Sequence, residues 1–247
     1  MKIYINGCSF SAGHQGLRDR GGKAWCKLFN QDVSVINDSL NGGSSFRALR
    51  MCIENVIAND DLDVVICQLS KMERGEMFIR AEQLNHFDRD VYINYGLDGF
   101  VQDYDRYEVL DILNQEGFKR SGHGYIGEEK EVFRNDLGET LEDKFQHKIR
   151  IFNDQMMTSN NDRELHILGL CNNLKLLCKA KGVKLLFTAM DEKCIPNVKH
   201  ITPYFTKPMS YIVGKQGPLV ESDTDCHPNE DGHYEIYRYI ISELEKL

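Results

Sequence analysis

Residues 63–70 read Asp-Val-Val-Ile-Cys-Gln-Leu-Ser, an almost unbroken apolar run. A strand that is apolar on both faces is typical of a parallel sheet covered by helices on both sides. Three further segments carry strand signals, namely residues 2–6, 33–37 and 183–190. Because segments with helical spacing separate these strands, we expect an α/β fold, a three-layer α/β/α sandwich of flavodoxin-like type with a mostly parallel sheet.

The helical segments are recognised by their spacing and their caps. Residues 46–58 form an amphipathic run, and the serines just before it can cap a helix there. Residues 229–247 are also amphipathic, and another helix should end near residues 179–182, which read Lys-Ala-Lys-Gly. Residues 22–31 place Ala, Trp, Leu and Phe at helical spacing, so a helix is predicted there as well.

The chain should form one domain with an insertion. Its 247 residues suffice for one sizeable core, so we expect a single domain over residues 1–247. From Lys71 to about Asp136 the periodicity is lost, which we interpret as an insertion or lid after the third strand, with a small helical subdomain as the alternative. The many aromatic side chains of this stretch favour a roof over the expected cleft, rather than a separate knob or a subunit contact.

Composition and charge exclude several classes of protein. Hydrophobic residues make up 41% and charged residues 28%, which excludes disorder as the main state. The net charge of −8 opposes nonspecific binding to nucleic acid or to an anionic membrane, so neither is an expected partner. A signal peptide and a transmembrane run of about 18 apolar residues are both lacking, so we expect a cytoplasmic protein, with association with a virus particle as the alternative.

The eight cysteines are scattered singly, without a CxxC pair. This pattern indicates reduced, buried thiols rather than a disulfide framework or a zinc site. We therefore predict no metal and no cofactor.

Three short segments contain what acyl transfer requires. Residues 7–13 read Gly-Cys-Ser-Phe-Ser-Ala-Gly and follow the first strand, where open α/β sheets bind ligands, so Ser9 is the candidate nucleophile. Residues 41–45 read Asn-Gly-Gly-Ser-Ser, and glycines let a backbone N–H approach an oxyanion. Before the final helix, His227 is a candidate base with Asp225 two residues away. Each segment alone has an ordinary role in a turn or a cap, but their joint order indicates a Ser-His-Asp site.

That order resembles the SGNH (GDSL-like) hydrolase family, in the variant of many bacterial and phage sequences whose first block reads Gly-Cys-Ser-Phe. Residues 7–10 match the block of the nucleophile, residues 37–45 look like the block that donates to the oxyanion hole, and residues 225–229, Asp-Cys-His-Pro-Asn, match the closing block. The resemblance covers about two thirds of the chain and implies the fold and the chemistry of that family.

The resemblance also implies a role for each matched residue. Ser9 attacks the acyl carbonyl, His227 takes its proton and Asp225 orients His227, with Asp223 as the alternative acid. The N–H groups of Ser9 and Gly42 hold the oxyanion.

One block departs from the family, because the third strand is followed by Ser70 where an Asn is expected. Ser70 is the nearest candidate for the third oxyanion donor, although a hydroxyl reaches less far than an amide, and Gln68 or Arg74 is the alternative donor. We assign the substrate-binding positions to His14, Gln68 and Arg74.

The predicted function is that of a serine esterase or deacylase acting on a small ester, with an acylated carbohydrate as the substrate class. The alternatives are a weak or inactive SGNH-fold module with a binding or structural role, for example in a phage particle, and an O-acyltransferase that uses the same triad. The sequence makes no prediction of the oligomeric state.

Overall fold

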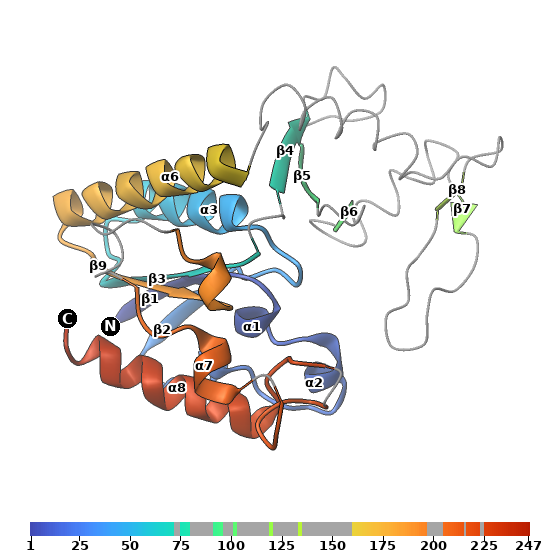
Figure 1. Ribbon diagram of the computed structural model, residues 1–247. Coiled ribbons are helices and arrows are strands. Elements are labelled where there is room, and N and C mark those ends of the chain that lie inside the picture. Colours follow the sequence, from blue (N-terminus) through green and yellow to red (C-terminus); the bar gives the residue numbers. More distant parts are fainter. Residues whose placement is uncertain are drawn as a thin grey trace. The chain divides into compact units, whose positions relative to one another are not determined.

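The computed structural model describes residues 1–71, 160–196, 205–214, 216–222 and 225–247, together with five short strands between residues 75 and 134 (Figure 1). It divides into two compact units. The first comprises Met1–Gly75 and Arg163–Leu247, and the second comprises Glu76–Asp162.

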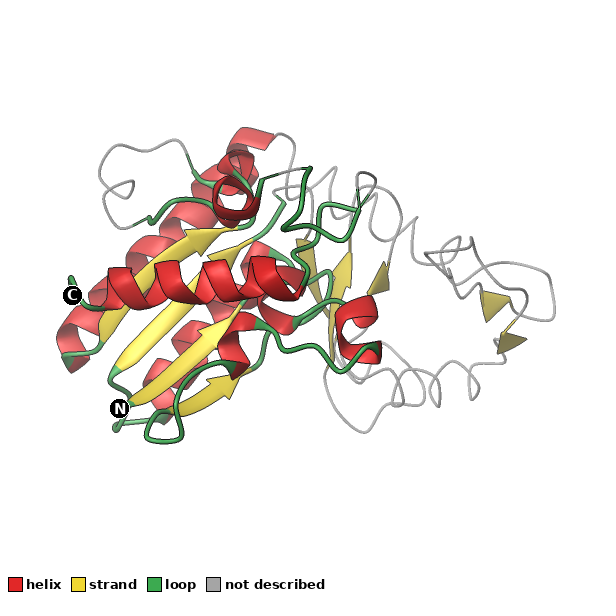
Figure 2. Ribbon diagram, turned by 90° about the horizontal axis from the view of Figure 1, so that it is seen from below, coloured by secondary structure: helices red, strands yellow, loops and turns green. Residues whose placement is uncertain are grey.

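The first unit is built on a four-stranded sheet whose pairings are all parallel (Figure 2). Its order is β2-β1-β3-β9, formed by Lys2–Asn6 (β1), Ser34–Asn37 (β2), Val64–Leu69 (β3) and Lys184–Ala189 (β9). Every residue of β3 is buried, as its apolar sequence predicts. Each strand begins and ends within one residue of its predicted bounds, so the expected parallel α/β fold is confirmed at this level.

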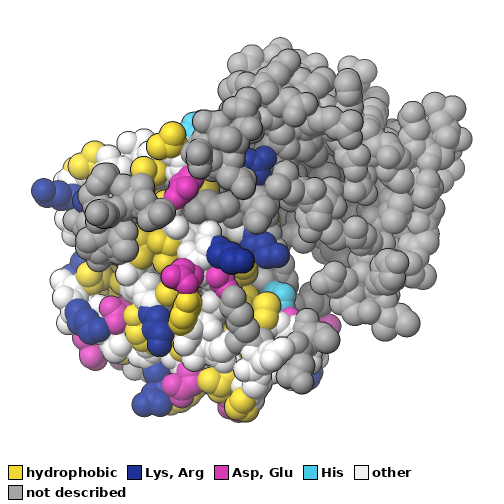
Figure 3. Space-filling model, in the orientation of Figure 1, with side chains coloured by type: hydrophobic (Ala, Val, Ile, Leu, Met, Phe, Trp, Pro, Cys, Tyr) yellow, Lys and Arg dark blue, Asp and Glu magenta, His cyan; other side chains and the backbone are white. Residues whose placement is uncertain are grey.

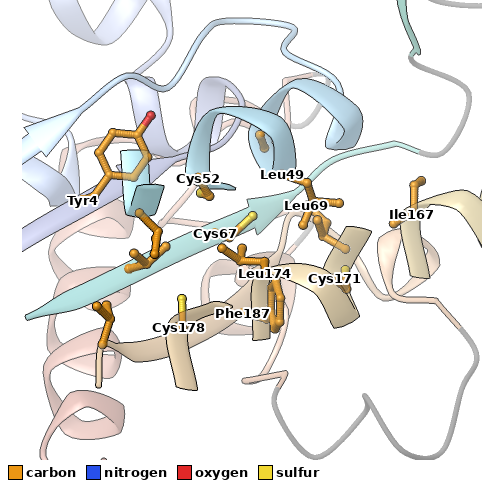
Figure 4. Close-up of a cluster of buried hydrophobic side chains, with 14 of the residues drawn as sticks. Tyr4, Leu49, Cys52, Cys67, Leu69, Ile167, Cys171, Leu174, Cys178 and Phe187 are labelled. Atoms are coloured by element: carbon orange, nitrogen blue, oxygen red, sulfur yellow. The ribbon is translucent and has the colours of Figure 1, made fainter. Parts of the chain in front are cut away.

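Two long helices cover one face of this sheet, α3 (Ser45–Ala58) and α6 (Asn160–Lys181) (Figure 1). Between the helices and the sheet lies a buried apolar cluster that includes Cys52 of α3, Leu174 of α6 and Phe187 of β9 (Figure 4). The helix α3 begins where the sequence predicts, because the hydroxyl of Ser44 accepts a hydrogen bond from the N–H of Arg47 at 3.1 Å.

The other face is covered by α7 (Met209–Val213) and α8 (Glu230–Leu244). A second buried cluster joins Ile236 and Ile240 of α8 to Ile3 and Ile5 of β1. The short helices α1 (Ser9–Ala12) and α2 (Gln15–Asp19) follow β1 and precede a turn of 3₁₀ helix, η1 (Trp25–Lys27). The sheet therefore carries helices on both faces.

The predicted helix over residues 22–31 is wrong, because only Trp25–Lys27 are helical and they form a single 3₁₀ turn. The Trp25 ring is fully buried and its Nε1–H donates to the Phe10 carbonyl at 3.1 Å. Burial of this one large side chain fixes the path of the segment, and tertiary packing overrides the weak helical spacing.

The second unit contains two small sheets. One has the order β4-β5-β6, from Gly75–Ile79, Val91–Tyr95 and Val101–Gln102, and β5 and β6 are antiparallel. The other is an antiparallel pair, Lys119–Arg120 (β7) and Phe133–Arg134 (β8). The predicted lid, its helical alternative and the aromatic roof fall mainly outside the described residues.

The described surface is mixed in character. Figure 3 shows Lys and Arg side chains interspersed with Asp, Glu and hydrophobic ones on the face of view. All eight cysteines are free thiols, of which seven are buried and Cys226 is exposed. Within the described segments, no helix has both the length and the apolar character needed to cross a bilayer.

Candidate active site

Ser9 lies on a tight turn at the carboxyl end of β1, one of the two central strands of the sheet. The backbone of Cys8 is extended, and its carbonyl accepts hydrogen bonds from the N–H groups of Ser11 and Ala12, both at 2.9 Å. The turn closes at Gly13, whose φ of 76° favours glycine. The chain passes from β1 to its neighbour β2 and then crosses back over β1 to β3 on the other side, so the strand order reverses at β1 and Ser9 stands where such sheets form ligand crevices.

His227 is held by the loop that leads into α8. The side chain of Asn229 caps this helix by accepting from the N–H of Gly232 at 3.0 Å. Its amide also donates to the carbonyls of Pro218 and Val220, at 2.8 and 3.1 Å. One asparagine thus ties the start of α8, just after His227, to two points of the loop before His227.

The three residues assigned to the triad lie together in the structure. The Ser9 Oγ is 2.9 Å from Nε2 of His227, and the Nδ1 of His227 is 2.5 Å from Oδ1 of Asp225. The backbone N–H of His227 donates to the same oxygen at 3.0 Å. A proton on Nδ1, facing the carboxylate, leaves Nε2 as the acceptor for the Ser9 hydroxyl.

The charge of Asp225 suits this orientation. Partial burial on its own would raise the pKa of this carboxyl, but the hydrogen bonds from the backbone and the ring of His227 outweigh it and the pKa is lowered. Asp225 is therefore ionised at neutral pH and stabilises an imidazolium at His227. The acid weighed as its alternative, Asp223, lies outside the described residues.

Two rings fix the imidazole of His227. The Phe10 ring packs against it in a tilted orientation, with a centroid distance of 5.6 Å. The His14 ring stacks on it at a centroid distance of 5.2 Å, with an angle of 26° between the His14 and His227 planes. The Nε2 of His14 accepts from the N–H of Leu17 at 3.1 Å and lies 3.2 Å from a carboxylate oxygen of Glu221. Burial lowers the pKa of His14, although Glu221 opposes this. The structure therefore places His14 behind His227 as a largely buried support, not on an open substrate surface.

Glu221 itself is held by Arg20, whose guanidinium donates to both carboxylate oxygens at 2.6 and 2.5 Å. These two residues are 201 positions apart. Sequence reasoning missed this pair and the contact of Phe10, because nothing in the local pattern links them to the site.

Gln68 is completely buried and lies beneath the turn of Ser9. Its Oε1 accepts from the N–H of Cys8 at 3.3 Å and from the hydroxyl of Ser11 at 2.5 Å, and its Nε2 lies 3.1 Å from the Cys8 sulfur. All the polar atoms of this side chain are thus engaged within the protein, which corrects its assignment to the substrate-binding surface. Arg74, the third such assignment, lies outside the described residues.

Ser70 is also buried, and its donors are occupied. Its hydroxyl donates to the carbonyl of Gly43 at 2.7 Å and its N–H donates to the hydroxyl of Ser45 at 2.9 Å. The hydroxyl can serve an oxyanion only by giving up the bond to Gly43. In this structure Ser70 connects the end of β3 to the loop before α3.

The N–H groups of Ser9 and Gly42 remain the candidate oxyanion donors. No acceptor among the described residues takes a hydrogen bond from either of them, whereas the N–H of Gly43 donates to the carbonyl of Leu40 at 2.9 Å. Gly42 has a φ of 74°, a conformation that side-chain-bearing residues rarely adopt.

The surroundings of the triad are partly open. The side chains of His227 and Asp225 are 33% and 44% exposed, whereas the whole Ser9 residue is 7% exposed. In the described part of the chain, no cluster of three or more His, Cys, Asp or Glu side chains could hold a metal ion.

The chain matches none of the known protein-family models with which it was compared, and no curated protein matches it. The function is therefore inferred from the geometry of the site.

Proposed function

We propose that the chain is a serine hydrolase of SGNH type that cleaves a small carboxylic ester, with an O-acyl group on a carbohydrate as its substrate class. The observation that carries this proposal is the unbroken hydrogen-bonded series from the Ser9 hydroxyl through His227 to Asp225, with distances of 2.9 and 2.5 Å. A nucleophile, a base and an orienting acid in this arrangement are what acyl transfer requires.

The arrangement supports a two-step reaction. The Oγ of Ser9 attacks the acyl carbon while Nε2 of His227 takes the hydroxyl proton, and the ring then returns that proton to the departing alcohol. A water molecule, deprotonated by His227, hydrolyses the resulting acyl-serine and regenerates the hydroxyl. The N–H groups of Ser9 and Gly42 are assigned to the oxyanion that forms in each step.

The fold supports the same proposal. A parallel sheet of order β2-β1-β3-β9 with helices on both faces fits the three-layer sandwich that the SGNH resemblance implies. The nucleophile follows the first strand and the acid and base precede the last helix, in the order of the family blocks.

Ser70 favours a second candidate function, a catalytically weak or inactive binding module of the same fold. Its hydroxyl is committed to Gly43, so a third oxyanion donor is lacking among the residues assigned to the hole. Loss of one such donor costs about 100-fold or more in rate. An O-acyltransferase would use the same triad and differ in the acceptor of the acyl group.

The test combines p-nitrophenyl acetate with a fluorophosphonate probe that labels activated serines. We expect hydrolysis and labelling of the wild type, and a loss of about 1000-fold or more in Ser9→Ala and His227→Ala. The matched control is Ser242→Ala, which removes a hydroxyl bonded to a carbonyl within α8 and should retain full activity.

Three results separate the candidates. A wild-type rate equal to that of Ser9→Ala, without labelling, overturns the hydrolase proposal and favours the binding module. If an added sugar alcohol is acetylated faster than water hydrolyses the acetyl group, the protein is a transferase. Free acetate as the product supports the esterase.

A further inference from the structure

Gln68 is a polar side chain inside a strand that is otherwise apolar and fully buried. A buried amide is costly unless its hydrogen bonds are satisfied. Here its partners are Cys8, which directly precedes Ser9, and Ser11, two residues after it. The Gln68 side chain of β3 therefore binds the nucleophile turn on both sides of Ser9.

Gly7 also contributes to this contact, because it has no side chain. A Cβ atom at this position would lie 2.5 Å from Oε1 and 2.7 Å from Cβ of Gln68, distances that real contacts do not reach. The absence of a side chain at Gly7 lets the backbone of the turn rest directly on Gln68. The turn and the glutamine thus form one closely packed unit.

We infer that Gln68 is a positioning residue that sets the direction of the Ser9 hydroxyl and N–H through Cys8 and Ser11. This inference rests on the proposed hydrolase function. The contacts of Gln68 hold the backbone just before Ser9 and the helical turn just after it. They therefore determine where the Ser9 Oγ lies relative to His227. A displacement of about 1 Å at a reacting group costs on the order of 100-fold in rate.

The chemistry of an amide matters as well as its shape. Oε1 serves two donors, while Nε2 offers a hydrogen to the Cys8 sulfur. A glutamate has the same shape and keeps both acceptor contacts, but when ionised it has no donor and brings a negative charge beneath the turn where the oxyanion forms. When protonated, it regains a donor and resembles glutamine.

The experiment compares Gln68→Met, Gln68→Glu and a matched control. Thr188 pairs with Gln68 in the β3–β9 register, is equally buried, and its hydroxyl has no partner among the described residues. Thr188→Val therefore changes a neighbouring buried position of the sheet and leaves the turn untouched.

For p-nitrophenyl acetate, we expect Gln68→Met to lower kcat about 100-fold with KM changed less than about 2-fold. For Gln68→Glu, the rate relative to wild type should rise as the pH falls and the carboxyl takes up a proton. Thr188→Val should keep the wild-type kcat and pH profile. A kcat within about 2-fold of wild type in folded Gln68→Met, or a flat rate ratio for Gln68→Glu, would overturn the inference.

A second readout separates this inference from the proposed function. Hydrogen exchange of the Cys8 amide, measured by NMR, should accelerate at least about 10-fold in Gln68→Met and stay unchanged in Thr188→Val, because only the first change removes its acceptor. If the wild type neither hydrolyses esters nor reacts with the probe, the proposed function fails. Accelerated exchange of the Cys8 amide in Gln68→Met would still support the contact of Gln68 with the turn. Unchanged exchange in this variant contradicts that contact, whatever the activity.

Discussion

Lowering the pH should destabilise this protein through His233, a buried histidine of α8. Its ring is fully buried, its Nδ1 accepts from the N–H of Trp25 at 3.4 Å, and its Nε2 has no partner among the described residues. Burial, with smaller contributions from His14 and His227, lowers its pKa from 6.5 to about 3. The folded protein therefore keeps this ring neutral at pH values where the unfolded chain protonates it.

The direction and the magnitude of this pH effect on the free energy of unfolding follow from proton linkage. The contribution of His233 is fully present above pH 6.5 and is lost as the pH falls toward about 3, because only the unfolded state binds the proton in that window. Each unit of pH inside the window costs about 1.36 kcal/mol. Between pH 7.5 and 4.5, with these two pKa values, the free energy of unfolding should fall by about 2.7 kcal/mol through this residue.

Urea unfolding measures this loss, followed by the fluorescence of Trp25, the single tryptophan of the chain. In His233→Asn, an amide oxygen replaces Nδ1 as the acceptor and the titrating ring is lost. The variant should be less stable than wild type at pH 7.5. It should lose less stability on acidification, because no buried ring takes up a proton. The control is His166→Asn, at an exposed position of α6. Wild-type and His233→Asn curves that run parallel from pH 7.5 to 4.5 would refute this reasoning.

Three further predictions concern the loops around the site. Gly42→Ala forces a side-chain-bearing residue into a φ of 74° and should cost about 1–2 kcal/mol in urea unfolding; no loss would show that this turn relaxes freely. Asn229→Ala removes the cap of α8 and two loop bonds, so thermal unfolding should report a loss of about 1–2 kcal/mol and ester assays a lower kcat. Asp225→Ala should impair ester hydrolysis less than Ser9→Ala, and an equal loss in both would assign Asp225 a larger role than orientation.

The core strands could be predicted because their signal is local. Residues 63–70 are apolar on both faces, and this composition is compatible with a strand buried between two helical layers. The caps Ser44 and Asn229 are local in the same way, because each side chain bonds a backbone N–H three residues later. Residues 22–31 show the limit of such signals, since the burial of Trp25 against Phe10 depends on a segment outside the predicted helix.

The order of residues along the chain sets which side chains are available for chemistry and in which sequence blocks they occur. Folding brings Ser9 and His227, which are 218 positions apart, within hydrogen-bond distance, and it engages the hydroxyl of Ser70 with the carbonyl of Gly43; neither contact has a local sequence signal. Folding also turns Gln68 toward the nucleophile turn. A polar residue in a buried strand signals a hydrogen-bonded role, but its partner depends on packing across the sheet. The physical reason is that backbone preferences and caps act between neighbours in the chain, whereas a site is assembled by contacts that exist only after the strands have paired.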